Sequence, residues 1–228
     1  MIVEFIGLPS SGKTTFIKQI QKHHKGALEI KHPLNELYNK SWFLRNIIKT
    51  KFLLSNVFLN KKSIYECIKI FNSIEGVKKG ESFKRMFNNI FYIVFYNSIQ
   101  KSEEKIYMFD EGILHHCWAT YLNNNSEKVI DFSTCINLFE PSDLLIYMRM
   151  DKEIAIERNM NRNMKNNRKN KLNKRHLEFL TNINEEIKKM DLIVQDYKKS
   201  NPHKNILIID VENIDKLNLD TFSNAYLR

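Results

Sequence analysis

The 228-residue sequence is poor in cysteine, proline and glycine, and it contains no long uninterrupted apolar run. It has three cysteines, far apart and without a Cys-x-x-Cys pair, which predicts a reducing compartment and no structural zinc: Cys67, Cys117 and Cys135. No apolar run approaches the roughly 20 residues of a membrane-spanning helix, so we expect no membrane insertion. The first residues also lack the basic segment of a signal peptide. Together these absences predict a cytoplasmic protein.

Positive charge is in excess, because 36 Lys and Arg against 26 Asp and Glu give a formal net charge of +10. A basic domain can bind nucleic acid or an anionic surface. Here the excess is spread along the chain as a general richness in lysine and asparagine, which is typical of a solvated surface. We therefore do not expect nucleic acid as the main partner. The densest basic segment, residues 158–176, is the exception.

Short apolar runs separated by helical patterns organise the chain. The runs predict five strands, at residues 2–6, 27–31, 105–112, 143–150 and 204–211. Residues 34–101 have few helix breakers and repeated helical spacing, and the aromatic run at 91–96 within them favours core over a base-stacking platform. Strands that alternate with helices imply a parallel sheet covered on both faces. The length fits one domain, residues 1–228.

Two of only six glycines stand close together at the start of the chain, and a lysine directly follows the second. They belong to GLPSSGKT, which matches G-x-x-x-x-G-K-[ST] between a predicted buried strand and a predicted helix. A tight curl presents successive backbone N–H groups, and a helix N-terminus adds partial positive charge, so the segment suits a phosphate chain. We predict a nucleotide·Mg²⁺ site formed by Gly7, Ser10, Ser11, Gly12, Lys13, Thr14 and Thr15.

Other segments narrow the class of phosphate-loop protein. The sequence has no guanine-reading Asn-Lys-x-Asp segment and no LSGGQ-like signature, which excludes GTP-binding switches and transport ATPases. Instead, DEG at 110–112 ends the strand expected beside the phosphate loop. IAIERNMNR places Arg158 and Arg162 one helical turn apart, so that both guanidinium groups can point at one polyanion.

In the order and spacing of these motifs the sequence resembles the nucleoside and nucleotide kinases, nearest the thymidylate kinase and deoxynucleoside kinase branches. GLPSSGKTT resembles their phosphate loop, IYMFDEGILHHCWATYL their third strand and next helix, and IAIERNMNR their lid. HLEFLTNINEEIKKM and NILIIDVENID resemble the long helix after the lid and the final strand. The resemblance covers residues 1–31 and 105–215. It implies a three-layer α/β fold with a five-stranded parallel sheet, a helical acceptor-side insertion (about 32–104), a lid (about 158–175) and ATP as donor.

The resemblance also implies roles for single residues. Lys13 reaches the β- and γ-phosphates, Thr14 ligates Mg²⁺, and Asp110 accepts the acceptor's proton or organises Mg²⁺. Arg158 and Arg162 close over the transferring phosphate. A simpler interpretation of Asp110, as a cap on the next helix, stays open.

The acceptor side departs from the relatives, which have arginine where this chain has Glu111. A carboxylate there should repel a nucleoside monophosphate. We leave three interpretations of Glu111 open: a second Mg²⁺ ligand, part of a site for a cationic or hydroxyl-rich acceptor, or an exposed residue. The other candidate acceptor-site residues, for each of which a structural role is the simpler interpretation, are His115, Arg45 and Arg85.

Three functional hypotheses follow. The first is an ATP-dependent kinase whose small-molecule acceptor is by family default a nucleoside or nucleoside monophosphate, with a sugar or surface-polysaccharide intermediate as the alternative. The second is a nucleotide-responsive ATPase or binding protein with a nucleic-acid or protein partner. The third is a kinase of a nucleic-acid end. Steep weakening by salt would mark polyanion binding. A homodimer is compatible with all three.

Overall fold

The computed structural model describes residues 1–23, 29–31, 37, 39–73, 79–99, 105–121, 136–166, 179–212 and 219–227. Five parallel strands form one sheet in the order β2-β3-β1-β4-β5. Their bounds are β1 Ile2–Ile6, β2 Glu29–Lys31, β3 Lys105–Phe109, β4 Leu144–Arg149 and β5 Asn205–Asp210. The predicted five-stranded parallel sheet is therefore confirmed.

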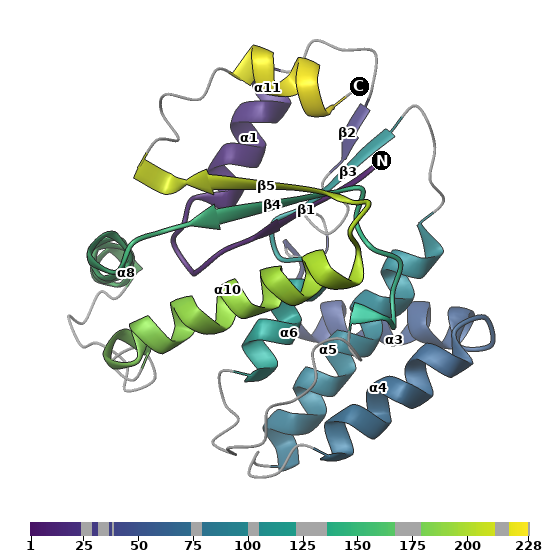
Figure 1. Cartoon of the computed structure of the whole chain (residues 1–228). Coiled ribbons are helices and arrows are strands. Elements are labelled where there is room, and N and C mark those ends of the chain that lie inside the picture. The colour runs from purple at the N-terminus through teal and green to yellow at the C-terminus, as the bar shows by residue number, and fades with distance from the viewer. Residues whose placement is uncertain are drawn as a thin grey trace.

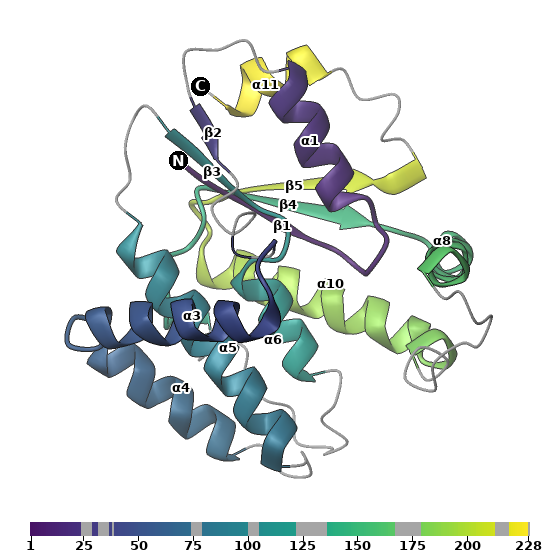
Figure 2. The ribbon, with the colours of Figure 1, turned by 180° about the vertical axis from the view of Figure 1, so that it is seen from behind.

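Helices cover both faces of this sheet (Figure 1). One face carries α1 (Lys13–His23) and α11 (Leu219–Tyr226). On the other face lie α10 (Ile183–Ser200), α6 (Ile113–Tyr121) and α5 (Lys79–Ser98). The helices α3 (Trp42–Asn56) and α4 (Lys61–Ser73) pack against α5, and the three together are the insertion helices. Figure 2 shows from behind that α8 (Lys152–Asn166) stands at the end of the sheet where the strands finish. The strands read as nearly continuous apolar runs because both of their faces are covered.

Two predicted apolar patterns form the core on the insertion side of the sheet. The aromatic run at 91–96 is largely buried in α5, where Tyr96 packs against Phe109 of β3 with ring centroids 4.5 Å apart. The stripe along the long helix after the lid forms the buried face of α10, through Ile183, Met190, Val194 and Tyr197. Both patterns therefore have the core role that their spacing predicts.

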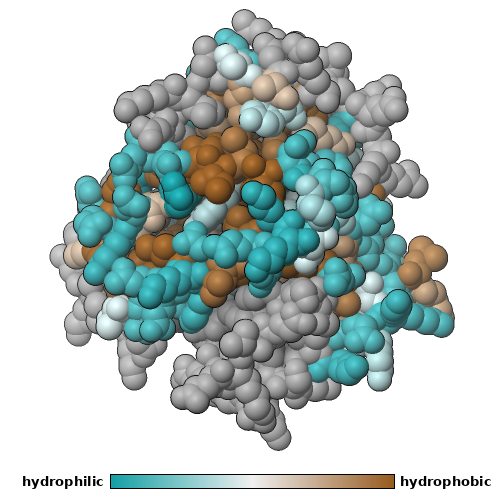
Figure 3. Space-filling model, viewed as in Figure 1, coloured by the Kyte–Doolittle hydropathy of each residue, from teal (hydrophilic) through white to brown (hydrophobic). Residues whose placement is uncertain are grey.

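One of the two edge strands of the sheet is β5, and it carries an apolar side chain at the surface. Ile208 of β5 is 51% exposed, and Leu192 of the neighbouring α10 is 54% exposed. Figure 3 shows apolar surface, in brown, over this side of the molecule. None of the described helices is both long and apolar enough to cross a bilayer.

The predicted lid is described only in part. Its first residues belong to α8, which ends at residue 166. The rest of the lid, up to about residue 175, lies outside the described residues.

A carboxylic acid inside β1 joins the sheet to the turn after β3. Glu4 is fully buried, and its Oε1 accepts a hydrogen bond from the backbone N–H of Leu114 at 2.8 Å. The same carboxyl lies against Gly112, where an added Cβ would overlap it, and close to the Tyr96 hydroxyl. Glu4 therefore fixes the start of α6 and the glycine of the DEG segment relative to β1.

Burial controls the protonation of this acid. It raises the pKa of Glu4 from 4.5 to about 8, and the hydrogen bond from Leu114 and the nearby Tyr96 hydroxyl offset only part of the effect. Between these two values the folded protein keeps the proton while the unfolded chain has lost it. The free energy of unfolding therefore falls as the pH rises from about 4.5 to about 8, and the contribution of Glu4 is constant above that window.

We expect Glu4→Gln to become more stable relative to wild type as the pH rises through this window, because glutamine has no proton to release on unfolding. The difference in unfolding free energy should change by up to about 1.4 kcal/mol per pH unit. Urea denaturation at several pH values between about 5 and 8 measures it. Glu157→Gln, the same change at an exposed position of α8, is the control. Parallel pH profiles for wild type and Glu4→Gln would contradict a protonated Glu4.

Candidate active site

Three adjacent strands bring the candidate residues to one edge of the sheet. β1 pairs with β3 on one side and with β4 on the other, and all three run in parallel. β1 continues into the phosphate loop (residues 7–14), β3 ends next to Asp110, and β4 leads into α8. Ligands of open parallel sheets bind beyond the carboxyl ends of the strands. The loop, the acidic turn and the lid helix therefore meet where such a ligand would bind.

The phosphate loop has the tight curl that its motif predicts. Gly12 and Ser10 adopt φ values of 94° and 67°, in the left-handed region that turns the backbone N–H groups inward. Gly7 has no space for a side chain, because an added Cβ would lie 2.7 Å from the carbonyl oxygen of Met148 in β4. The loop is therefore held against β4 at its start and curled over the first turn of α1.

Lys13 lies folded over this loop. Its Nζ donates hydrogen bonds to the carbonyl oxygens of Gly7 at 2.7 Å and Leu8 at 3.0 Å, and to the Ser11 hydroxyl at 3.3 Å. The residue is only 8% exposed. Three oxygen acceptors therefore hold the amine at the position where the oxygens of a phosphate chain could accept its hydrogen bonds instead.

The electrostatics of Lys13 show which predicted residues lie near it. Burial lowers its pKa from 10.5 to about 8, the carboxylates of Glu111 and then Asp110 oppose this, and Arg162 adds to it. Arg158 lies next to the loop, since a Cβ added at Gly12 would be 3.9 Å from one of its terminal nitrogens. The structure thus gathers the lysine, both acids and both arginines around the phosphate loop.

A hydrogen bond joins the two predicted Mg²⁺ ligands. The Thr14 hydroxyl donates to Oδ2 of Asp110 at 2.7 Å, which ties the first turn of α1 to the end of β3. Hydroxyl and carboxylate oxygens together with phosphate oxygens are the ligands that Mg²⁺ prefers, so this pair fits the ion. In the first turn of α6, which Asp110 would cap in the simpler interpretation, the backbone N–H of Leu114 donates its hydrogen bond to Oε1 of Glu4.

Asn159, which no sequence motif indicates, joins α8 to the phosphate loop. Its Nδ2 donates to the carbonyl oxygens of Pro9 at 3.1 Å and Ala155 at 2.8 Å, and its Oδ1 accepts from the Ser10 hydroxyl at 3.2 Å. The residue is 2% exposed. Because Arg158 directly precedes it, this contact holds Arg158 beside the loop.

The structure places the predicted acceptor-side residues in different parts of the molecule. Glu111 is exposed, and its carboxylate raises the pKa of Lys13 more than the carboxylate of Asp110 does. His115 of α6 lies in the same electrostatic surroundings, and its pKa is well below 6.5, mainly through burial and then through Lys13. Arg45 lies on α3, on the side of the insertion helices. The side chain of Arg85 lies outside the described residues.

The comparisons with known proteins give distant structural likeness alone. No protein-family model matches the chain, and no curated protein matches it. Three solved structures of deoxyadenosine kinase from M. mycoides are similar to it. The one with bound dCTP is 19% identical, with 98% of this chain and 97% of that chain covered and a TM-score of 0.44. The one with bound dATP is 20% identical, with 100% of both chains covered and a TM-score of 0.44.

The third, with the products dCMP and a flexible dCDP, is 20% identical, with 97% of this chain and 94% of that chain covered and a TM-score of 0.41. These neighbours belong to the group of enzymes that the sequence motifs resemble. At such identities and TM-scores the likeness assigns neither activity nor substrate to this chain.

We expect Asn159→Ala to weaken ATP binding about 5- to 30-fold, because the loss of roughly 1–2 kcal/mol of hydrogen bonding releases α8 from the phosphate loop. Titration of ATP·Mg²⁺ by calorimetry measures the dissociation constant. The matched control is Asn161→Ala, the same truncation on the exposed side of α8. Equal affinities for the two variants would show that the contact does not support the nucleotide site.

Proposed function

We propose that this protein is an ATP-dependent phosphotransferase that moves the γ-phosphoryl group of ATP to a small-molecule acceptor. The observation that carries the proposal is the placement of opposite charges around one curled loop. Lys13 and Arg158 lie against the loop, and the Thr14–Asp110 pair lies at its helical end. The resemblance to nucleoside and nucleotide kinases makes a nucleoside or nucleoside monophosphate the first acceptor class to test.

The donor side follows from the geometry of the loop. The triphosphate of ATP accepts hydrogen bonds from the inward-facing backbone N–H groups and from Lys13, which exchanges the carbonyl oxygens of Gly7 and Leu8 for phosphate oxygens. The oxygens of Thr14 and Asp110, which the hydrogen bond between them brings together, would hold Mg²⁺. The ion supplies neutralisation of the charge on the phosphate oxygens.

The transfer step needs positioning and charge neutralisation more than covalent chemistry. Arg158 and Arg162 bind the equatorial oxygens of the transferring phosphoryl group from α8. Asp110 organises the metal side and, for a hydroxyl acceptor, takes the proton. An arginine in this position contributes roughly 10³–10⁵ in rate, or about 4–7 kcal/mol.

A screen of ATP consumption tests the proposal directly. Nucleosides, nucleoside monophosphates, sugars and sugar phosphates are each offered with ATP·Mg²⁺ at low and high salt, and Lys13→Ala serves as the blank. We expect acceptor-dependent ADP formation in at least one class, with little dependence on salt. If every acceptor leaves wild type at the rate of the blank, the kinase proposal fails for these classes. ATP turnover that responds only to RNA, and only at low salt, would favour the nucleotide-responsive binding protein.

We expect Arg158→Ala to lower kcat at least 100-fold and to change the ATP dissociation constant less than about threefold, because the guanidinium binds charge that develops in the transition state. Steady-state kinetics and ATP titration measure the two quantities separately. Lys152→Ala removes a positive charge from an exposed position of the same helix and is the control. Equal losses of turnover and affinity would place Arg158 in ground-state binding instead.

A further inference from the structure

The inner side of α3 carries a buried amine that no sequence motif indicates. Lys49 is 8% exposed, and its Nζ donates a hydrogen bond to Oδ1 of Asn88 in α5 at 2.9 Å. The same Nζ lies 4.9 Å from the ring centroid of Phe91 and 5.7 Å from that of Tyr92. An ammonium group has three protons to donate, and here one neutral oxygen and two aromatic faces surround it.

The charged neighbours of this amine are cations. Burial lowers the pKa of Lys49 from 10.5 to about 8, and Arg45 and Lys84 lower it further. Arg45 is one helical turn before Lys49 on α3, and Lys84 belongs to α5. Within the described part of the chain, no carboxylate forms an ion pair with Lys49. Lys49 is buried, Arg45 is half-buried and Lys84 is exposed. The two outer cations repel the buried amine, and an anion placed among the three would remove that cost.

Two adjacent residues of α6 connect this cluster to the phosphate loop. The pKa of His116 is lowered from 6.5 to about 3, mainly by burial and then by the charge of Lys49. His115, whose ring centroid is 6.2 Å from that of His116, responds in turn to Lys13 and Asp110. Adjacent residues of α6 therefore lie near Lys49 and near Lys13.

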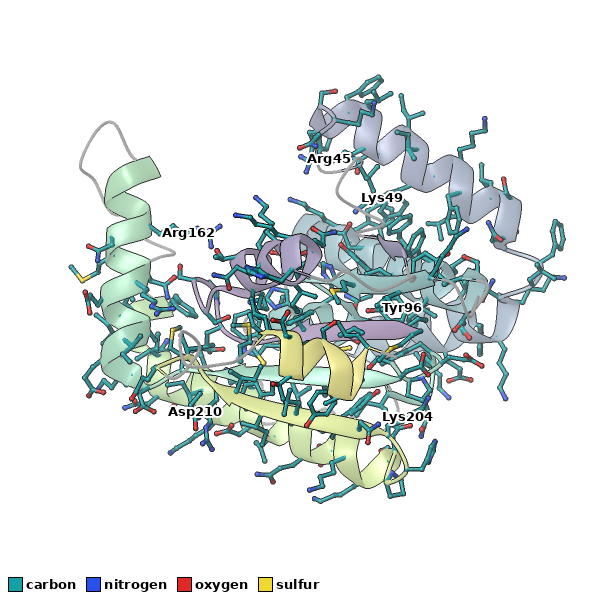
Figure 4. The ribbon with its side chains drawn as sticks, turned by 90° about the horizontal axis from the view of Figure 1, so that it is seen from above. Arg45, Lys49, Tyr96, Arg162, Lys204 and Asp210 are labelled. Carbon is teal, nitrogen blue, oxygen red and sulfur yellow. The ribbon has the colours of Figure 1, made fainter. Side chains whose placement is uncertain are left out.

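The cluster and the lid arginines lie on opposite sides of the proposed transfer site. Figure 4 shows Arg45 and Lys49 on α3 on one side of α1 and the phosphate loop, and Arg162 on α8 on the other side. The lid arginines thus serve the donor end. The cations of α3 and α5 lie on the side of the insertion, where the acceptor is expected.

We propose that Lys49, together with Arg45 and Lys84, binds an anionic group of the phosphoryl acceptor. This inference rests on the proposed kinase function and narrows it to acceptors that carry a phosphate or a carboxylate, such as a nucleoside monophosphate or a sugar phosphate. The Glu111 carboxylate lies near Lys13 at the donor side of the proposed site. Attraction from Lys49 would offset the repulsion of a monophosphate that is expected from Glu111.

Binding without turnover tests the anion site on its own. A non-hydrolysable ATP analogue with Mg²⁺ fills the phosphate loop, and inorganic phosphate is added up to tens of millimolar against sodium chloride of equal ionic strength. We expect phosphate to raise the Tm of wild type beyond the chloride control by a few degrees, and Lys49→Met to abolish this shift. Lys51→Met, at an exposed position of α3, is the matched control and should keep it. No shift in wild type, or equal shifts in wild type and Lys49→Met, would overturn the proposal.

The variant also separates binding from structural support. We expect Lys49→Met without phosphate to melt at or above the wild-type temperature, because methionine fills a similar volume without the repelled charge. A Tm far below that of wild type would assign Lys49 to the support of the fold. In that case Arg45→Met, at a half-buried position, decides the question: it should reduce the phosphate shift by at least half, and an unchanged shift overturns the proposal.

Matched acceptor pairs connect the site to catalysis. For deoxyadenosine and dAMP, thymidine and dTMP, and glucose and glucose 6-phosphate, the anionic member that is turned over should have at least a tenfold higher kcat/KM than its neutral partner. Lys49→Met should reduce that preference at least tenfold and leave the KM for ATP unchanged. A Lys49-dependent phosphate shift without any turnover would remove the kinase proposal and keep the anion site. Turnover of neutral acceptors that is insensitive to Lys49→Met would keep the kinase proposal and remove the anion site.

Discussion

The hydrogen bond between Thr14 and Asp110 fixes the relation between the phosphate loop and the strand beside it, and the rest of the site is arranged around that relation. It forms only because β1 and β3 pair in one register, with Glu4 opposite Phe109. A slip of one residue would move the end of β3 by about 3.3 Å and reverse its side chains. Apolar burial on both faces of β1 sets the register, so the core determines where the acid meets the hydroxyl.

Positive and negative side chains alternate across the site. Arginines of α8 lie on one side, the acidic turn after β3 lies near the buried lysine of the loop, and further cations lie on the insertion helices. Each basic group is poorly solvated or close to another cation, which lowers the pKa of both buried lysines. Such an arrangement is costly when empty and becomes favourable when a chain of anionic groups runs through it.

The sequence could predict the features that depend on local patterns. Apolar runs located the strands, GLPSSGKT located the loop, and the i, i+4 spacing placed Arg158 and Arg162 on one helix. The sequence did not indicate the roles of Glu4, Asn159 and Lys49, because these roles arise from partners far away in the chain. A single acid within the buried run IVEFI was a usable signal for Glu4. Lys49 gave none, because lysine is common in this sequence and only burial distinguishes this one from the others.

Prediction of the acceptor side was limited for a further physical reason. The residues proposed for it come from α3, α5 and α6. Aromatic contacts set the packing of these helices, such as that between Tyr92 and His116, whose ring centroids are 3.9 Å apart. Helical spacing indicates which residues of one helix share a face, but not which neighbour that face will meet. Arg45 was therefore recognisable as a candidate, whereas its grouping with Lys49 and Lys84 required the tertiary structure.

The contact between Glu4 and Gly112 restricts how this chain can vary over evolutionary time. Any residue larger than glycine at position 112 would occupy the volume of the Glu4 carboxyl, so the two positions are not free to change independently. A side chain acquired after the acidic pair requires that the Glu4 carboxyl move or that a smaller residue replace it in the middle of β1. Variation of this turn at the surface is therefore coupled to variation inside the sheet.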